Sequence, residues 1–392
     1  MSAPAVKIMS SHARQQVRGN DVLTVLSVIG TRPEAIKMAP VIRELERADG
    51  VRSVVCVTAQ HREILDQVLD VFSIRPDIDL NLMAPDQSLS ALTANLFRAL
   101  DPVVADTRPD WVLAQGDTTT VLVASLVAFY HRVRFGHVEA GLRTGNRDQP
   151  FPEEVNRHIA DTVADLHFAP TARCRAALLA EGISGARIHV TGNTVIDALL
   201  AVIGQPYDWS DGPLAVLPAA ERLVLVTAHR RESFGAPLND ICLALRDLAS
   251  GFADGEARLV YPVHPNPNVR RPVYNVLGGL PNVSLIEPLG YRDMAQLMRR
   301  STLILTDSGG IQEEAPSLGV PVLVMRDTTE RPEAIEAGVA RLVGTRRERI
   351  VSEATRLLRD PAAHAAMATR VNPYGDGHAA SRIASILVEG TA

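Results

Sequence analysis

Short runs of β-branched and other apolar residues alternate with longer amphipathic stretches from Val22 onward. This alternation is typical of β-α units around a parallel sheet, in which short buried strands are followed by crossover helices. The sequence therefore predicts an α/β fold. Since a typical domain holds ~150 residues, a chain of 392 residues is expected to form roughly two to three domains.

The first half of the chain contains a complete series of such units. The expected strands are Val22–Ile29, Val54–Thr58, Trp111–Ala114, Phe135–Val138, Leu166–Ala169 and Ile188–Thr191. The expected helices are Pro33–Ala48, Arg62–Phe72, Leu89–Ala105, Val121–Tyr130, Glu153–Ala164, Ala172–Glu181 and Thr194–Ile203. The stretch that follows is rich in glycine and proline, which predicts a linker.

The alternation resumes beyond the linker. The expected strands are Leu223–Thr227, Leu259–Val263, Val283–Ile286, Leu303–Thr306 and Val320–Met325, with helices that include Leu238–Ala249, Met294–Arg300 and the alanine-rich Ala362–Ala368. We therefore expect two doubly wound, Rossmann-like domains facing across a cleft. Ligands of such sheets bind outside the carboxyl ends of the strands, so both sets of loops would surround one substrate.

Composition excludes several classes of partner. Forty basic and forty-five acidic residues give a net charge of −5 with histidine neutral, so no global field favours nucleic acid or an anionic membrane. No apolar run reaches the ~18 residues of a membrane span, and no insertion into a membrane is expected. The three cysteines, Cys56, Cys174 and Cys242, are far apart, which argues against a disulfide framework or a zinc site and favours the cytoplasm.

Common cofactor and catalytic motifs are missing from the sequence. No G-x-G-x-x-G follows the first strand, and no G-x-x-x-x-G-K-[ST] occurs, so nicotinamide and P-loop chemistry lose their usual support. H-E-x-x-H and G-x-S-x-G are also missing, which counts against zinc proteases and serine hydrolases.

Two turns after expected strands suit an anion. The segment GTRPEAIKMAP brings Arg32 and Lys37 near the start of a helix, where backbone N–H groups and the helix dipole favour a phosphate. The segment TDSGGIQEEAPSLG offers a similar turn in the second half. Its candidate ligand residues are Ser308, Gly309, Gly310 and Glu314, with Arg331 as a further cation. For either turn the alternative is an ordinary helix start with exposed charges.

Acidic and histidine side chains also follow expected strands. The candidates are Asp117, Glu139, Glu153 and His229. Each alone could be a helix cap, a first-turn acid or a core histidine. Together, and surrounded by arginines, they indicate an acid/base site.

Several segments resemble, in order, those of the non-hydrolysing UDP-N-acetylglucosamine 2-epimerases. The segments are GTRPEAIKMAP, VTAQHREILDQVL, GDTTT, GHVEAGLRTG, PEEVNRH, TGNTVIDALL, AHRRESFG, YPVHPNPNVR, LTDSGGIQEEAPSLGVPVLVMRDTTERPEA and NPYGDG. The resemblance begins near Val22 and runs to the C-terminus, and residues 1–21 form an extension outside it.

The resemblance implies a glycosyltransferase-B-like fold, with a first domain at residues 22–195, a UDP-binding second domain at 196–377, and a final helix at 378–392 that crosses back to the first. It implies a homodimer that interconverts UDP-GlcNAc and UDP-ManNAc, without metal or nicotinamide cofactor, and supplies ManNAc-type sugars for cell-surface polysaccharide. UDP would leave C1 as a base removes the C2 proton, which gives 2-acetamidoglucal, and re-addition would give the epimer.

Matched motif by motif, the resemblance implies roles for the candidates. Asp117, Glu139 and Glu153 would be the acid/base carboxylates, and His229 would lie near the leaving diphosphate. Arg32 and Lys37 would bind substrate in the first domain. The UDP pocket of the second domain would comprise Ser308, Gly309, Gly310, Glu314 and Arg331. Which carboxylate addresses which face of C2 stays open.

Some family members carry an activating UDP-GlcNAc beside the catalytic one. The matching positions here are Gln60, His61, Glu153, Arg230 and His264. Three positions depart from the family pattern: Glu63 replaces a glutamine, Gln115 a common histidine and Ala228 a common glycine. A carboxylate at position 63 would repel a diphosphate that it faced.

Three alternatives stay open at this stage. A hydrolysing 2-epimerase would release UDP and free ManNAc, and a retaining glycosyltransferase would use the same nucleotide pocket with an acceptor groove. A catalytically silent UDP-sugar sensor would tolerate the loss of an acid/base group, yet all four candidates are present.

Overall fold

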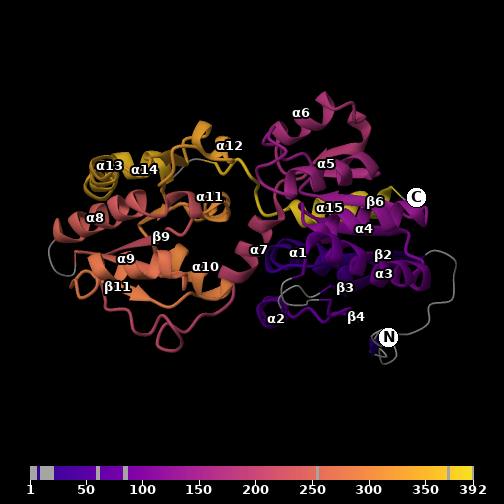
Figure 1. The fold of residues 1–392 in the computed structure, drawn as a ribbon, viewed down its shortest axis with the longest axis horizontal. Coiled ribbons are helices and arrows are strands. Elements are labelled where there is room, and N and C mark those ends of the chain that lie inside the picture. The colour runs from indigo at the N-terminus through magenta and orange to yellow at the C-terminus, as the bar shows by residue number, and fades with distance from the viewer. Residues whose placement is uncertain are drawn as a thin grey trace. The chain divides into compact units, whose positions relative to one another are not determined.

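A computed structural model describes residues 7–8, 22–58, 62–82, 87–252, 256–368 and 371–390. The chain divides into two compact units, one formed by Met1–Ala198 with Gly375–Ala392 and the other by Leu199–Tyr374 (Figure 1). Each unit is built around a single sheet with helices on both faces.

The sheet of the first unit has the strand order β1-β4-β3-β2-β5-β6-β7-β8. Its strands are β1 (Lys7–Ile8), β2 (Leu23–Ile29), β3 (Val51–Val57), β4 (Ile78–Asp79), β5 (Trp111–Gln115), β6 (Arg134–Val138), β7 (Leu166–Ala169) and β8 (Ile188–Val190). All neighbouring pairs are parallel except β1 with β4. Parallel strands buried on both faces need continuous apolar runs, which explains why the burial of β2 and β5 is nearly complete.

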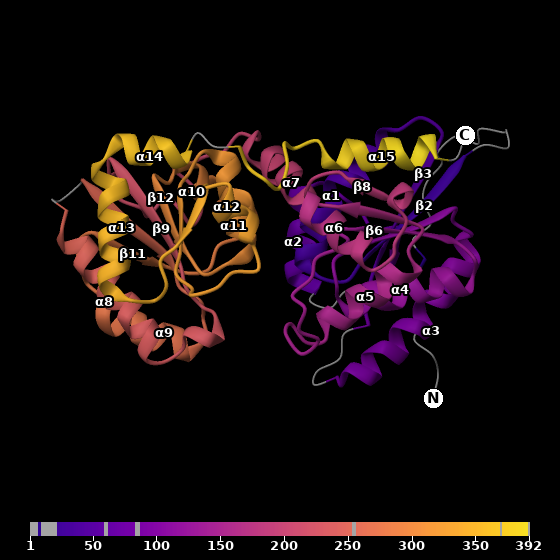
Figure 2. The ribbon, with the colours of Figure 1, turned by 90° about the horizontal axis from the view of Figure 1, so that it is seen from above.

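Helices cover both faces of this sheet. They are α1 (Arg32–Arg47), α2 (Arg62–Val71), α3 (Leu89–Thr107), α4 (Thr119–Tyr130), α5 (Glu153–Val163), α6 (Ala172–Ala180), the 3-10 turn Gly185–Arg187, α7 (Thr194–Ile203) and α15 (Ala379–Glu389). The C-terminal helix α15 packs beside α1 (Figure 2), and the N–H of Ala380 donates to Asp197 of α7 at 2.8 Å. One part of the core joins Leu96 and Leu100 of α3 to Val121 of α4 and the strands beneath them.

The sheet of the second unit is entirely parallel, in the order β11-β10-β9-β12-β13-β14. Its strands are β9 (Arg222–Thr227), β10 (Ala257–Pro262), β11 (Val283–Ile286), β12 (Leu303–Thr306), β13 (Val322–Val324) and β14 (Ala340–Leu342). Its helices are α8 (Ala236–Ser250), α9 (Pro267–Leu277), α10 (Tyr291–Arg300), α11 (Gly309–Glu314), α12 (Pro332–Glu336), α13 (Arg347–Arg359) and α14 (Pro361–Ala368), with 3-10 turns at Arg231–Ser233 and Ala315–Leu318.

The strand order reverses direction once in each sheet. In the first unit the chain winds outward from β2 on one side and from β5 on the other, and in the second it does so from β9 and β12. This arrangement confirms the prediction of two doubly wound α/β sheets. A crevice opens at such a reversal outside the carboxyl ends of the two central strands, and ligands of these folds bind there.

The expected strands and helices are all present, with ends that shift by a few residues. Shifts of three residues occur at the start of β3, at Val51 rather than Val54, at the start of α10, at Tyr291 rather than Met294, and at the end of α15, at Glu389 rather than 392. The start of β3 was not predicted because the polar residues Arg52 and Ser53 interrupt its apolar run.

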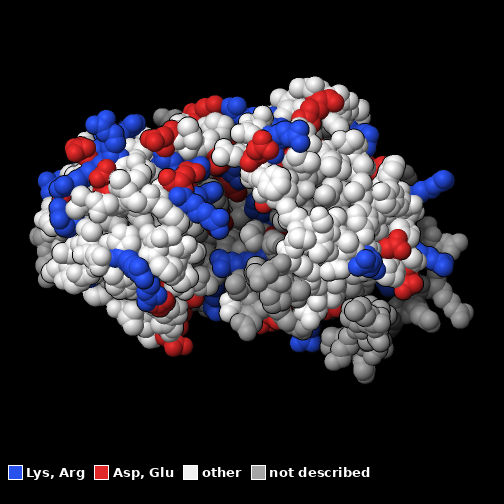
Figure 3. Space-filling view, viewed as in Figure 1, with Lys and Arg blue, Asp and Glu red and all other residues white. Residues whose placement is uncertain are grey.

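Charged side chains of both signs are interspersed over the face drawn in Figure 3, in keeping with the small net charge of −5. Among the described residues, no helix is long and apolar enough to cross a membrane.

Candidate functional site

The turn after β2 lies at the reversal point of the first sheet. Glu34, in the first turn of α1, reaches back so that its Oε2 accepts the N–H groups of Thr31, at 2.9 Å, and of Gly30. Its Oε1 accepts the hydroxyl of Thr118, from the turn after β5. A single carboxyl thus joins the turns that follow the two central strands.

Glu34 is only 2% exposed, and this burial shifts its titration. Burial raises the pKa of Glu34 to about 7, although its hydrogen bonds oppose the shift by lowering it. Glu34 was not among the site residues predicted from the sequence. A threonine followed three residues later by a glutamate is the signal of a capping box, which could have marked it.

A second carboxylate lies at the end of β6. Glu139 is 8% exposed, and its Oε2 lies 2.6 Å from Nζ of Lys37 and 2.5 Å from the amide Nε2 of Gln115. Its backbone has a φ of 66°, in the left-handed region that non-glycine residues seldom adopt. The structure therefore brings together two predicted site residues, Lys37 and Glu139, and adds Gln115, the last residue of β5.

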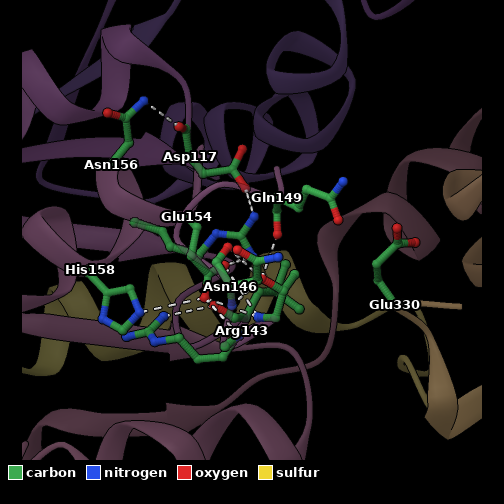
Figure 4. A network of polar contacts seen from close by, with 12 residues as sticks. Asp117, Arg143, Asn146, Gln149, Glu154, Asn156, His158 and Glu330 are labelled. Atoms are coloured by element: carbon green, nitrogen blue, oxygen red, sulfur yellow. Dashed lines mark hydrogen bonds and ion pairs between the residues drawn. The ribbon is translucent and has the colours of Figure 1, made fainter. Parts of the chain in front are cut away.

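Asp117 lies in the turn between β5 and α4. Side chains of α5 bind both its carboxylate and its backbone oxygen (Figure 4). Its carboxylate pairs with Nη2 of Arg157 at 2.7 Å, and its backbone oxygen accepts the side-chain amide of Asn156 at 2.9 Å. Glu153 is the first residue of the same helix and is half-buried. These contacts tie the turn that carries Asp117 to the helix that Glu153 begins.

The segment before α5 is fixed by a further polar network, also drawn in Figure 4. The buried carboxylate of Glu154 accepts the N–H groups of Thr144 and Gly145, each with an N–O distance of 3.1 Å. Arg143 pairs with Asp161 at 2.8 Å and with Glu181 at 2.6 Å. Arg143 therefore has a structural role. Arg32, at the start of α1, has no part in this network and is exposed to solvent.

In the second unit, Asp307 organises the turns after β9 and β12. It is fully buried, and its Oδ2 accepts the N–H groups of His229 and Arg230 at 2.6 and 2.7 Å. The ring of His229 stacks on that of His264 with 5.4 Å between centroids. Burial lowers the pKa of His229; Asp307 opposes this effect, while His264 and Arg230 add to it.

The glycine turn at the start of α11 is bordered by two guanidinium groups. A Cβ placed on Gly309 would lie 3.8 Å from Nη2 of Arg230 and 3.9 Å from Nη2 of Arg331. A Cβ on Gly310 would lie 3.9 Å from Oε1 of Glu314. Arg331 is itself ion-paired with the buried Glu313, which holds it beside the turn.

Each unit thus carries its own set of predicted residues in the segments that follow the carboxyl ends of its strands. The first unit carries Arg32, Lys37, Asp117, Glu139 and Glu153, and the second carries His229, Arg230, His264, Ser308, Gly309, Gly310, Glu314 and Arg331. Gln60 and His61, two of the predicted activator positions, lie outside the described residues.

A family model described as UDP-N-acetylglucosamine 2-epimerase matches residues 43–388 of the chain. The chain belongs to this family. An Escherichia coli K12 protein named UDP-N-acetylglucosamine 2-epimerase is 55% identical over 372 residues, which cover 93% of this chain and 98% of that protein. The family predicted from the sequence motifs is therefore confirmed.

Solved structures of the family share the fold. A Listeria monocytogenes protein described as a UDP-N-acetylglucosamine 2-epimerase matches with a TM-score of 0.88 at 47% identity, covering 94% of this chain and 96% of that one. The Neisseria meningitidis UDP-GlcNAc 2-epimerase bound to UDP-GlcNAc matches with a TM-score of 0.84 at 47% identity, covering 94% and 100%. The fold is thus that of the epimerase family.

Proposed function

We propose that the chain interconverts UDP-GlcNAc and UDP-ManNAc by inverting C2 of the sugar. Membership of the epimerase family supports this proposal, and the Neisseria meningitidis relative was solved with UDP-GlcNAc bound. The structural observation that carries it is the buried carboxylate of Glu139, held by Lys37 and Gln115 at the carboxyl ends of β5 and β6. A positioned carboxylate beside a cation is what proton transfer next to a departing diphosphate requires.

The chemistry of C2 explains why several carboxylates are needed. The C2 hydrogen has no adjacent carbonyl, so its direct removal would leave an unstabilised carbanion. If a carboxylate takes this proton while the C1–O bond breaks, the bonding electrons leave with UDP and the neutral 2-acetamidoglucal remains. UDP then adds again to C1 while C2 is protonated from the other face. Proton carriers are therefore needed on both faces.

We assign the proton transfers to Asp117, Glu139 and Glu153. Asp117 and Glu139 are both held in place by basic side chains, Arg157 and Lys37, and this preorganisation favours a defined direction of proton transfer. The partly buried Glu153 begins α5, the helix whose Arg157 pairs with Asp117.

The diphosphate and uridine are assigned to the second unit. His229 would lie near the leaving diphosphate, and the proposed UDP pocket comprises Ser308, Gly309, Gly310, Glu314 and Arg331. The guanidinium groups beside Gly309 support this assignment, because paired arginines match the charge and geometry of phosphate oxygens. Arg32 and Lys37 would bind substrate from the first unit.

Four further expectations from the sequence stay predictions. They are the homodimer, the cytoplasmic location, the supply of sugars for cell-surface polysaccharide, and activation by a second UDP-GlcNAc at Gln60, His61, Glu153, Arg230 and His264. The stacking of His264 on His229 would place such an activator close to the reacting molecule. Strictly hyperbolic kinetics with UDP-GlcNAc alone would count against activation.

Proton NMR of the purified protein with UDP-GlcNAc in D2O tests the proposed reaction. We expect UDP-ManNAc with deuterium at C2, since the proton taken by a carboxylate exchanges with solvent. Free ManNAc and UDP would instead identify a hydrolysing epimerase. An unchanged spectrum from folded protein that binds UDP would overturn the proposal and favour a transferase or a sensor.

A further inference from the structure

A fully buried histidine in β6 connects α5 to the turn that carries Asp117. The Nδ1 atom of His137 lies 2.6 Å from Oδ1 of Asp161, and its Nε2 atom lies 2.7 Å from the backbone oxygen of Gly116. Gly116 directly precedes Asp117 and has a φ of 85°. The ring therefore bridges a carboxylate and a carbonyl across the base of this turn.

Both neighbours of the ring act only as acceptors when Asp161 is ionised. A neutral imidazole has one N–H and one lone pair, so either tautomer would direct a lone pair at an oxygen only 2.6–2.7 Å away. Only the imidazolium can donate to Asp161 and Gly116 together. With Asp161 ionised, the geometry thus requires a proton on each ring nitrogen.

The charges around His137 agree with this protonation state. Burial alone would lower the pKa of His137, but Asp161 and the two hydrogen bonds raise it above its ordinary value overall. Burial likewise acts to raise the pKa of Asp161, yet His137 and Arg143 lower it to about 2. His167, on β7, also faces this pair, and burial lowers its pKa.

We propose that His137 is a positioning residue that, as an imidazolium, fixes the Gly116 carbonyl and thereby the direction of the Asp117 carboxylate. With this contact the turn is held at three points, since Asn156 holds the Asp117 carbonyl and Arg157 holds its carboxylate. All three contacts lead to α5, because Asp161 lies on that helix. The inference rests on the proposed function, in which Asp117 is an acid/base group.

Nitrogen-15 NMR of the histidine rings tests the protonation state without any assay of activity. We expect both nitrogens of His137 to carry protons across neutral pH and at least one nitrogen of His167 to lack one. A single neutral tautomer at His137 would overturn the proposal, whether or not the protein epimerises its substrate. Failure of epimerisation with a protonated His137 would instead fault the proposed function.

Kinetics of His137→Asn test the positioning role. We expect kcat to fall on the order of 10²-fold with KM for UDP-GlcNAc changed by about twofold at most, because misorientation of one reacting group affects the chemical step more than binding. The matched control is His167→Asn, since His167 is equally buried and donates to the Asp161 carbonyl without touching the turn. We expect its kcat to stay near the wild-type value.

Asp161→Asn provides an independent variant if His137→Asn does not fold. It keeps the shape of the side chain but removes the negative charge that holds the proton on His137. We expect His137 to become neutral at pH 7 and kcat to fall while KM is nearly unchanged. Wild-type kcat in a variant with a neutral His137 would contradict the proposal.

Discussion

Lys37 and Glu139 form an ion pair with 2.6 Å between Nζ and Oε2, although they are far apart in the sequence. Lys37 comes from α1 and Glu139 from the end of β6, and the side-chain amide of Gln115 donates to the same carboxylate oxygen. Two donors thus converge on one oxygen of a buried carboxylate. A carboxylate held in this way cannot turn freely. Removal of either donor should therefore lower the rate of the reaction more than it lowers the stability of the fold.

Replacement of Lys37 tests this expectation. Lys37→Met removes the cation but keeps most of the buried stem, so Glu139 is left with the amide of Gln115. We expect kcat/KM for UDP-GlcNAc to fall on the order of 10²-fold, the cost of losing one preorganised donor from a reacting group. Arg47→Met, at the exposed end of the same helix, is the control. A Lys37→Met enzyme as active as this control would contradict the assignment.

The turn after β2 leaves no room for a side chain at Gly30. A Cβ there would lie 2.3 Å from Oγ1 of Thr120 and 3.1 Å from Oε2 of Glu34. We expect Gly30→Ala to lower the free energy of unfolding by about 1–3 kcal/mol, as overpacked sites do, and to lower activity because the two central turns must separate. Urea unfolding and initial rates measure both effects.

Gly185→Ala is the matched control for this substitution. A Cβ on Gly185 would meet its nearest atom, a guanidinium nitrogen of Arg175, at 3.4 Å, which is an ordinary contact. Equal stability losses in the two variants would show that the loss at Gly30 comes from the replacement of a glycine in itself and not from crowding in the turn.

Most strands were predictable because their apolar runs are long enough to cross a buried parallel sheet. The short strands β1, β4 and β14 were not predicted. Two helices were missed for different reasons. α9 begins at Pro267 and contains Pro272, so its sequence is typical of a loop. α13 is dominated by charge, and its buried Ile350, Ala354 and Leu357 follow a helical spacing that could have identified it.

Local sequence motifs predicted individual residues of the site, but they did not predict the contacts that the fold creates between distant residues. Lys37 and Glu139 were both singled out, but their contact depends on the sheet that brings α1 to β6. Gln115 attracted notice only as a departure from the family pattern, since its partner Glu139 is distant in sequence. His137 was missed because nothing near it in the sequence reveals the buried Asp161 beside its ring.

The buried carboxyl of Glu34 should make stability depend on pH. Burial raises its pKa from 4.5 to about 7, so between these values the folded chain binds more protons than the unfolded chain. The stability contribution of Glu34 is therefore complete below pH 4.5 and is lost as the pH rises through about 7. The full difference corresponds to about 3 kcal/mol, in order of magnitude.

Glu34→Gln checks this prediction, because the amide keeps the size of the side chain and does not titrate. Urea unfolding between pH 4.5 and 7.5 should show the wild type losing stability relative to the variant as the pH rises. Thr118→Val removes a hydrogen bond that lowers the pKa of Glu34, so the loss should extend to higher pH. Parallel stability curves for wild type and Glu34→Gln would rule out the raised pKa.

Two neighbours of His229 should change its titration in opposite directions. Burial lowers the pKa of His229, the charge of Asp307 raises it, and His264 lowers it. Asp307→Asn removes the negative charge but keeps an oxygen for the N–H groups of His229 and Arg230, so the pKa of His229 should fall further. His264→Asn removes the stacked ring and should raise it. NMR titration of the His229 ring measures both pKa shifts. Two shifts of the same sign would show that burial, and not the charges of Asp307 and His264, sets the protonation of His229, the residue assigned to the leaving diphosphate.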